Sequence, residues 1–503
     1  MNSSRGKGRE LEEEEDRWLA WRMEEDCFDF LKPFMKELDE RLDVRLVRTL
    51  ADTVTAIVRN RNRPQALLLS ELGGLVAGPK HSPAGTKRID RLIKSEGWKA
   101  KDIDDHLLDE ATLVMLNEAR LAREGKALCI LDSGVMEKPE SRELEGLSPV
   151  RSAKARRISR PRPKMGKGYY RGKPGGPIVV PGFEWTSALI TGWATRDERR
   201  PVALAAWHWY AKPKQVEGQA DQRAPAQGDE AELDPVVRER AVEAARAVLA
   251  EVSSVLGKEG LLHVWDRGFS GTAWLGEAMD EKYSFVVRWK KANKLRPAEA
   301  PSVGDEHASP YRQEQDGVAA WKLTRMKNWG TRKLANPRNP ACPITVGFAA
   351  RQVHLLHRNE PLYLVVVRLG KDAERKRGGS EPWRLLTNLP VRTAEGCWRI
   401  VQAYAARWAI EQEQRFSKSE FGIESVRVQD WEKRGKLLAI ASLAYAFLVR
   451  LLGDCSGPLI GQLLRWAHRT GRQANGAYRS LYRLRSALAN LWNSHVPVFR
   501  GVP

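Results

Sequence analysis

Four residues that can do chemistry recur at helical spacing in the stretch YAARWAIEQEQRFSK, residues 404–418. The stretch lacks Gly and Pro and is rich in Ala, Glu, Gln and Arg, so it predicts a helix. At about 100° per residue, one stripe about 60° wide holds Tyr404, Arg407, Glu411 and Lys418. One interpretation is a solvated face with an Arg407–Glu411 pair. The other, a face turned toward something other than bulk solvent, is favoured because the apolar residues between the four need burial on another side of the helix.

Two aspartates follow short apolar runs that read as buried strands. Asp132 ends ALCIL (127–131), and Asp266 ends LLHVW (261–265). Either residue alone is a common turn residue or helix cap. Taken together, they would meet if the two strands are neighbours, because chemistry collects beyond the carboxyl ends of such strands. Two adjacent carboxylates repel each other, and a hard divalent cation would remove that cost.

The elements around these residues predict an α/β fold. Three strands, a helix, a strand, a helix and a strand follow one another, and the chain in front of them is helical in pattern. Between Asp266 and Glu411 the chain is long enough for an added β-rich module, for which we expect residues 290–384. The expected elements are strands in 127–131, 185–195, 201–211, 261–265 and 283–289, and a helix over 234–256.

Composition points to a polyanionic partner. The 503 residues carry a net charge of +20, which suits nucleic acid or an anionic membrane. The longest apolar run, 437–449, is shorter than the ~20 residues of a membrane span, so we expect a buried helix and no membrane role. The five cysteines lie far apart, which argues against a disulfide framework or zinc ribbon and is consistent with the cytoplasm.

Two regions have the charge pattern of DNA contacts. Within 1–118, we expect a loop at Ser82, Pro83 and Gly85 and then a basic helix of helix-turn-helix type. The cations of that helix are Lys87, Arg88, Arg91 and Lys94. Residues 150–183, among them Lys164 and Lys167, hold ten Lys or Arg and no acid, which predicts a mobile loop that closes over DNA. The alternatives are an ordinary charged helix face and a solubilising loop.

The 404–418 pattern, Y-x2-R-x3-E-x6-K, resembles the signature of bacterial insertion-sequence DDE transposases of the "insertion sequence four" family. The stretches LDSGVMEKP, HVWDRGFSG and LLTNLP also resemble that family, in the right order, and the likeness extends over roughly residues 80–450. One departure is Ser133-Gly134, where many relatives carry a further Asp or Thr. The resemblance implies a ribonuclease-H-like catalytic core with Asp132, Asp266 and Glu411 as ligands of two Mg²⁺ ions, for which Mn²⁺ can substitute.

The same resemblance assigns further roles and a domain plan. Trp383, 21 residues before Tyr404, and Arg288, 22 residues after Asp266, match a base-stacking and a DNA-contacting position; a core tryptophan and a surface cation are the alternatives. DNA contacts are also implied for Tyr404, Arg407 and Lys418, and a homodimer for the synaptic complex. The expected parts are an end-binding domain (1–118), the core (119–289 and 385–430), the β-rich insertion (290–384) and a helical C-terminal domain (431–503).

The expected function is therefore cut-and-paste transposition. Such an enzyme binds terminal inverted repeats, cleaves DNA through a hairpin intermediate and joins the element to a target. Two alternatives remain open. One is a transposase-derived DNA-binding or regulatory protein without catalysis, and the other is a two-metal nuclease that performs no strand transfer.

Overall fold

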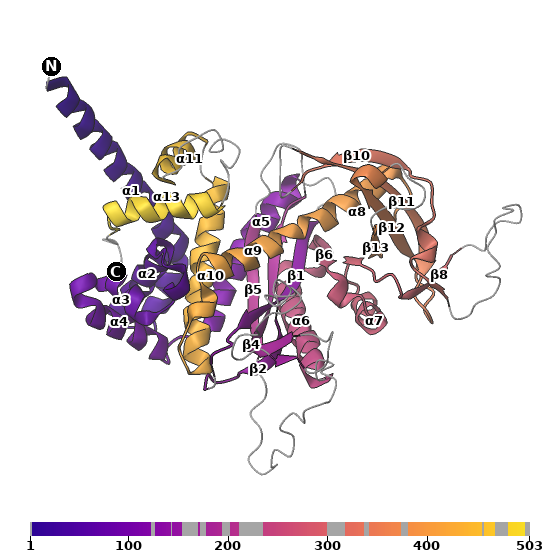
Figure 1. Ribbon diagram of the computed structural model, residues 1–503, viewed down its shortest axis with the longest axis horizontal. Helices are drawn as coiled ribbons and strands as arrows, with labels where there is room; N and C mark the ends of the chain where they lie inside the picture. The colour runs from indigo at the N-terminus through magenta and orange to yellow at the C-terminus, as the bar shows by residue number, and fades with distance from the viewer. Residues whose placement is uncertain are drawn as a thin grey trace, which may run out of the picture.

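One large mixed sheet crosses the centre of the computed structural model, with helices on both of its faces and a helical region at one end (Figure 1). The structure describes residues 3–121, 126–141, 143–152, 170–171, 178–193, 202–210, 235–298, 317–336, 342–373, 381–454, 457–467 and 481–497. The fold within these residues is mixed α/β, as the sequence predicts.

Five strands form the part of the sheet that holds the two aspartates. Their order is β5-β4-β1-β6-β7, so the first and fourth expected strands, β1 and β6, are neighbours. β1, β6 and β7 are parallel, whereas β4 is antiparallel to β1 and β5 is antiparallel to β4. The bounds are β1 Ala127–Glu137, β4 Ile178–Thr191, β5 Val202–Tyr210, β6 Leu261–Trp265 and β7 Phe285–Arg288.

β1 does not end at Asp132, which corrects the sequence-based expectation. Its parallel pairing with β6 stops at Leu131, but its antiparallel pairing with β4 continues to Glu137. The cause is β4, which is longer than expected and begins at Ile178 inside the basic segment. The segment also contributes β2 (Ser148–Arg151) and β3 (Tyr170–Arg171), which both pair with β4.

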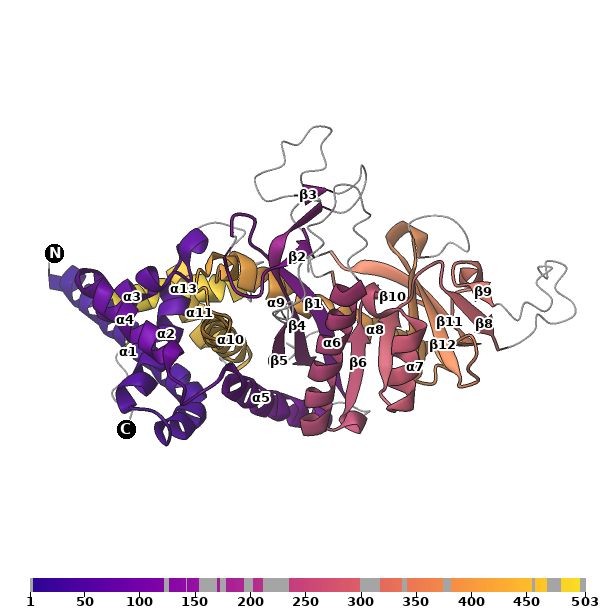
Figure 2. The same ribbon diagram turned by 90° about the horizontal axis from the view of Figure 1, so that it is seen from below.

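Alternation along the strands builds two cores. Leu128 and Ile130 of β1 belong to the core beneath α8 (Ala394–Ala406) and α9 (Trp408–Ser419). Cys129 and Leu131 belong to the core on the opposite face. That face is covered by α5 (Ala100–Leu121), α6 (Pro235–Leu256) and α7 (Thr272–Asp280) (Figure 2).

Strands from the expected insertion continue this sheet and do not form a separate one. β13 (Trp383–Thr387) pairs with β7, and β12, β11 and β8 follow in order. The remaining bounds are β8 Lys294–Pro297, β9 Val318–Ala319, β10 Gly330–Leu334, β11 Ile344–His354 and β12 Leu362–Leu369. The sheet therefore carries a purely antiparallel extension on the side of β7.

The N-terminal region is helical, as expected. Its helices are α1 Ser3–Asp39, α2 Val44–Arg59, α3 Leu69–Ala77 and α4 Ser82–Lys94. The expected loop at Ser82, Pro83 and Gly85 is wrong, because these residues form the first turn of α4, where proline is well tolerated. The turn lies earlier, at Gly78, whose φ is +87°. Gly85 packs directly on Gly73 of α3, where an added Cβ would meet the Gly73 carbonyl oxygen at 2.0 Å.

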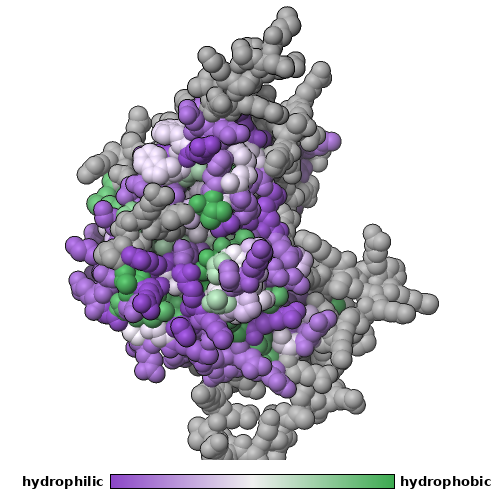
Figure 3. Space-filling view, turned by 90° about the vertical axis from the view of Figure 1, so that its left-hand side faces the viewer, coloured by the Kyte–Doolittle hydropathy of each residue, from purple (hydrophilic) through white to green (hydrophobic). Residues whose placement is uncertain are grey.

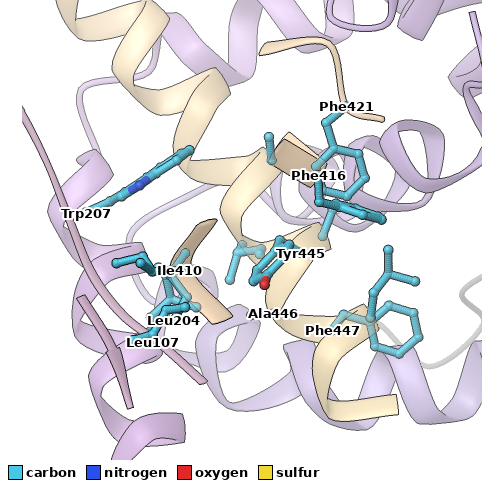
Figure 4. Packing of buried hydrophobic residues seen from close by; sticks show 14 of the residues in the cluster. Leu107, Leu204, Trp207, Ile410, Phe416, Phe421, Tyr445, Ala446 and Phe447 are labelled. Atoms are coloured by element: carbon cyan, nitrogen blue, oxygen red, sulfur yellow. The ribbon is translucent and has the colours of Figure 1, made fainter. Parts of the chain in front are cut away.

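The apolar run 437–449 lies in α10 (Trp431–Asp454), which is long and apolar enough to span a membrane. Of its most apolar window, 78% is buried inside the protein, as in a core helix. Figure 4 shows Tyr445 of α10 close to Phe416 of α9, while Ile410 of α9 lies near Leu204. The ring centroids of Tyr445 and Phe416 are 5.8 Å apart. The face in Figure 3 is mainly hydrophilic, and its hydrophobic residues form small separate groups.

A buried guanidinium joins three parts of the chain. Arg485 lies in α13 (Leu481–Ser494), which follows α11 (Gly457–Leu464), and is 1% exposed. It donates to the carbonyl oxygens of Ile57 and Asn60 at the end of α2. It also donates to the carbonyl and carboxylate of Glu420, which caps α9. The N-terminal helices, α9 and the C-terminal helix therefore share one buried contact.

Arg485→Met should lower the free energy of unfolding by about 3–5 kcal/mol, because it removes the guanidinium that pairs with the buried Glu420 carboxylate. Chemical unfolding followed by circular dichroism measures the change. Arg465→Met is the control, since Arg465 is exposed and pairs with Glu15 at 3.8 Å, and should cost less than about 1 kcal/mol. Equal losses in the two variants would contradict the assigned role of Arg485.

Candidate active site

The two aspartates follow paired residues on neighbouring parallel strands. Leu131 of β1 is in register with Trp265 of β6, and each is followed directly by its aspartate. Both aspartates continue the face that is covered by α8 and α9. Asp266 also caps the short 3-10 helix Arg267–Phe269 by accepting the Gly268 N–H. The sequence left open whether Asp266 is a turn and cap residue or a partner of Asp132. In the structure it caps a helix and also follows the strand next to that of Asp132.

Like charge and burial both act on Asp132. Its pKa is raised from 3.8 to about 7, mainly by burial, and the Asp266 and Glu411 carboxylates contribute to the increase. Arg407 and the Ser133 N–H, which donates to Asp132 at 2.9 Å, act in the opposite direction. The site therefore has an excess of negative charge that favours a nearby cation.

Arg407 supplies a positive charge between two of the predicted acids. Its Nη1 lies 3.3 Å from Asp132 Oδ2, and its Nη2 donates to Glu411 Oε1. The exposed fractions of the Arg407, Asp132 and Glu411 side chains are 16%, 17% and 32%. The guanidinium thus bridges β1 and α9 in a half-buried position, where an ion pair is screened less than at the surface.

The expected helix over 404–418 is interrupted at Arg407. α8 ends at Ala406 and α9 begins at Trp408, so Tyr404 and Glu411 lie on different helices. The Arg407 N–H bonds to the Tyr404 carbonyl at 3.1 Å, the tighter spacing of a 3-10 turn. Local propensity gives no sign of this break.

Tyr404, Trp383 and Arg288 lie together beside the aspartates. The rings of Tyr404 and Trp383 meet edge to face, with centroids 5.3 Å apart. Arg288 is in register with Leu385, two residues after Trp383. Burial raises the pKa of Tyr404, while the charges of Arg407 and Arg288 lower it. Trp383 is half-buried and packs against the core, so the core interpretation describes part of its surface.

Lys418 rests on a tryptophan that the sequence analysis did not select. Its Nζ lies over the ring of Trp185 in β4 at 5.0 Å from the centroid. Trp185 is in register with Gly134, where an added Cβ would approach the ring to 2.5 Å. A glycine inside a strand is a known sign of close approach, so Gly134 carried the signal for this contact.

A fully buried carboxyl, Glu413, was also missed. It lies on α9 two residues after Glu411 and accepts a hydrogen bond from Ser417 at 2.9 Å. Burial raises its pKa to about 7, and Ser417 and Lys418 oppose this. It is close enough to Asp132 to feel its charge. Its sequence context, between Gln412 and Gln414, is that of a polar face, so no sequence signal marks it as buried.

The remaining predicted DNA contacts lie elsewhere. Lys87 and Arg91 are exposed on α4. Arg88 is half-buried and pairs with Asp52 of α2 at 2.7 Å, so part of its charge is used inside the N-terminal region. Lys164 and Lys167 lie outside the described residues.

The donor set of the three acids suits a hard divalent cation, because all ligands would be carboxylate oxygens. In the part of the chain that the structure describes, however, no three His, Cys, Asp or Glu side chains stand close enough together to hold a metal ion. Arg407 lies between Asp132 and Glu411 instead. The carboxylate oxygens are therefore suitable metal ligands. In this structure, however, the guanidinium of Arg407 offsets the charge of two of the three acids.

Comparison with known proteins bears on this site. Residues 238–447 match the model of the transposase DDE domain. The matched segment contains Asp266 and Glu411, whereas Asp132 lies before it. The match covers fewer than half of the 503 residues and supports a DDE transposase. Among curated proteins, no sequence matches this chain.

A solved structure similar to the chain is the cryo-EM structure of the piggyBac transposase synaptic complex with hairpin DNA. The two are 10% identical with a TM-score of 0.27, and the match covers 74% of this chain and 55% of the other. The chain thus spans about half the length of that protein. A likeness this loose places no residues, so the site rests on its own geometry and on the match to the transposase DDE domain.

Gly134→Ala should lower the free energy of unfolding by about 1–3 kcal/mol, because the new methyl group forces the Trp185 ring and its neighbours to move. Thermal and urea unfolding measure this. In the matched control, Gly435→Ala, the added methyl group meets nothing within 4 Å inside α10, so stability should stay equal or rise by up to about 1 kcal/mol. A Gly134→Ala protein as stable as the Gly435→Ala protein would contradict the close contact.

Asp132→Asn should raise the unfolding temperature of the metal-free protein at pH 8 and leave it nearly unchanged at pH 4. The folded-state pKa is raised, so the cost of ionising Asp132 grows as the pH rises from about 4 to 7 and is complete above 7. Scanning calorimetry in EDTA at both pH values measures it. Asp280→Asn should act in the opposite direction, because Arg358 lowers the pKa of exposed Asp280. The same shift at both pH values for Asp132→Asn would exclude its raised pKa.

Proposed function

We propose that the protein is a DDE transposase of the "insertion sequence four" type. It would bind the terminal inverted repeats of its element, cleave DNA through a hairpin intermediate and transfer the strand to a target. The observation that carries the proposal is the placement of Asp132, Asp266 and Glu411 on one face of the sheet, in a chain that matches the transposase DDE domain.

A ribonuclease-H-like core is part of the proposal. Its support is the arrangement of the five strands, with three parallel strands next to an antiparallel pair and helices on both faces. Its two aspartates lie at the junction of neighbouring parallel strands, where such sheets place their sites. The third acid comes from a helix laid across the same face.

Asp132, Asp266 and Glu411 would hold two divalent ions, Mg²⁺ or Mn²⁺. When bound, such a pair activates the attacking water or 3′-hydroxyl and stabilises the leaving oxygen. The chain's own part would be to present the three carboxylates on one face of the sheet and to keep Asp132 ionised. Arg407 must withdraw from Asp132 for this, and a DNA phosphate is the partner that its guanidinium would then take.

Cations and aromatic rings around the acids would position the DNA. Lys418 and Arg288 are half-buried on the same side as the acids and would contact phosphates. Trp383 would stack on a base that is unpaired in the hairpin, with Tyr404 holding the edge of its ring. Stacking of this kind offsets the few kcal/mol that unstacking a base costs.

Recognition of the transposon end is proposed for α3 and α4. The glycine contact between them fixes a helix pair joined by a tight turn, and Lys87 and Arg91 are exposed on α4. Lys164 and Lys167 would add contacts to the DNA backbone. The protein would act on DNA as a homodimer in the cytoplasm.

One observation favours a second function, a DNA-binding regulator without catalysis. Arg407 bonds to both Asp132 and Glu411, so in this structure the charge of these acids is already offset. A regulator would keep this pairing when DNA binds. The two proposals therefore differ in whether DNA and metal displace Arg407.

Cleavage of DNA carrying the element's own ends, run on denaturing gels with Mg²⁺ or Mn²⁺, tests the proposal. The wild type should give a nick and a hairpin, and Asp132→Ala, Asp266→Ala and Glu411→Ala should each reduce the rate by on the order of 10²–10³, because several kcal/mol of metal stabilisation are lost. Asp280→Ala removes an exposed acid from α7 and should cleave like the wild type.

Each other outcome assigns a different function. Binding of the ends without any cleavage would identify the regulator. Cleavage without joining to a target plasmid would identify a nuclease. Cleavage that is unchanged in Asp266→Ala would remove Asp266 from the mechanism.

A further inference from the structure

The loop from Trp321 to Trp329, which joins β9 to β10, displays two tryptophans to solvent. Trp321 is 48% exposed and Trp329 is 42% exposed. Between them, Arg325 and Lys327 are also exposed. Residues 317–336 contain five Lys or Arg and no Asp or Glu. The loop therefore combines aromatic surface with two exposed cations, and it contains no acidic residue of its own.

A buried arginine holds this loop in one shape. Arg368 of β12 is 7% exposed and donates to the Thr324 carbonyl at 2.7 Å and to the Met326 carbonyl at 3.2 Å. It also donates to the Asn328 side-chain oxygen at 2.6 Å. The contacts fall on residues 324, 326 and 328, and the exposed cations lie between them at 325 and 327. Arg325 and Lys327 are thus held outward by a loop that is already ordered, which lowers the entropic cost of binding.

The loop is also tied to the candidate active site. The Trp321 N–H bonds to the Lys291 carbonyl at 3.2 Å, just beyond the end of β7. The Asn293 side chain then donates to the Ser270 carbonyl at 2.6 Å, in the turn that begins at Asp266. Two hydrogen bonds, connected through the backbone of residues 291–293, therefore link Trp321 to the loop that carries a proposed catalytic acid. In Figure 2, β9 and β10 lie on the side of the sheet away from the N-terminal helices.

We propose that the Trp321–Trp329 loop binds single-stranded DNA, stacking unpaired bases on Trp321 and Trp329 while Arg325 and Lys327 contact phosphates. This rests on the proposed function for the origin of the strand, which would continue from the DNA held at Asp266. Charge selects a polyanion, and exposed indole rings select one with free base faces. Paired bases in a duplex offer no such faces, so the loop should prefer single strands.

Binding of a fluorescein-labelled 20-nucleotide single strand, and of a 20-bp duplex of the same sequence, tests the proposal by anisotropy in EDTA. The Trp321→Ala/Trp329→Ala protein should bind the single strand about 10–100-fold more weakly, because about 1–3 kcal/mol per stacked base is lost. Duplex affinity should change by less than about threefold. Trp321→Phe/Trp329→Phe keeps two aromatic faces and should restore most of the single-strand affinity.

Trp18→Ala/Trp21→Ala is the matched control. Both residues are 52% exposed, but they lie on α1 in an acidic segment, so single-strand affinity should not change. Arg325→Ala/Lys327→Ala should weaken both DNAs and lower the slope of log K against log salt by up to about 1.4 for the single strand. Circular dichroism melting should show all these surface variants folded, within about 0.5 kcal/mol of the wild type.

Three results would overturn the proposal. They are a wild type that does not bind the single strand, a double tryptophan variant that binds it like the wild type, and equal losses for single strand and duplex in that variant. EDTA removes the divalent ions that cleavage requires, so this assay measures binding alone. Asp266→Ala should therefore bind the single strand like the wild type. Failure of the cleavage proposal and failure of this one are therefore seen in different assays.

Discussion

Repulsion among three carboxylates is the constraint on which the rest of the site depends. Asp132 and Asp266 follow paired positions of parallel strands, and α9 adds Glu411 on the same face. Such a cluster is unfavourable without positive charge. The pKa of Asp132 is raised first by burial and then by the neighbouring carboxylates of Asp266 and Glu411. In this structure Arg407 meets the requirement from the break between α8 and α9. The same excess of negative charge that makes the site costly makes it selective for a cation.

The sheet converts this constraint into a defined surface. Alternation puts the acids and Arg288 on the face covered by α8 and α9, while the opposite face is an apolar core. Trp185 then uses the space left by Gly134 to support Lys418 from below. The charged side chains of the site are therefore positioned by residues that do no chemistry themselves, such as Gly134 and Trp185. Much of the site's geometry depends on this packing.

The sequence predicted the elements whose signals are local. The apolar runs that end near Asp132 and Asp266 became neighbouring strands, and the helix expected over 234–256 is α6, because these patterns do not depend on distant partners. Features set by distant partners were missed or wrong. β1 passes Asp132 because β4 pairs with it, the helix breaks at Arg407, where two acids are bridged, and Glu413 is buried although its neighbours are polar.

Arg485 has a consequence for how the parts of the chain can move. Its guanidinium holds the carbonyls that end α2 and the residue that caps the helix of Glu411. A displacement of α2 must therefore either break these hydrogen bonds or carry the end of α9 with it, so that a load on the N-terminal helices is mechanically transmitted to the helix that carries Glu411.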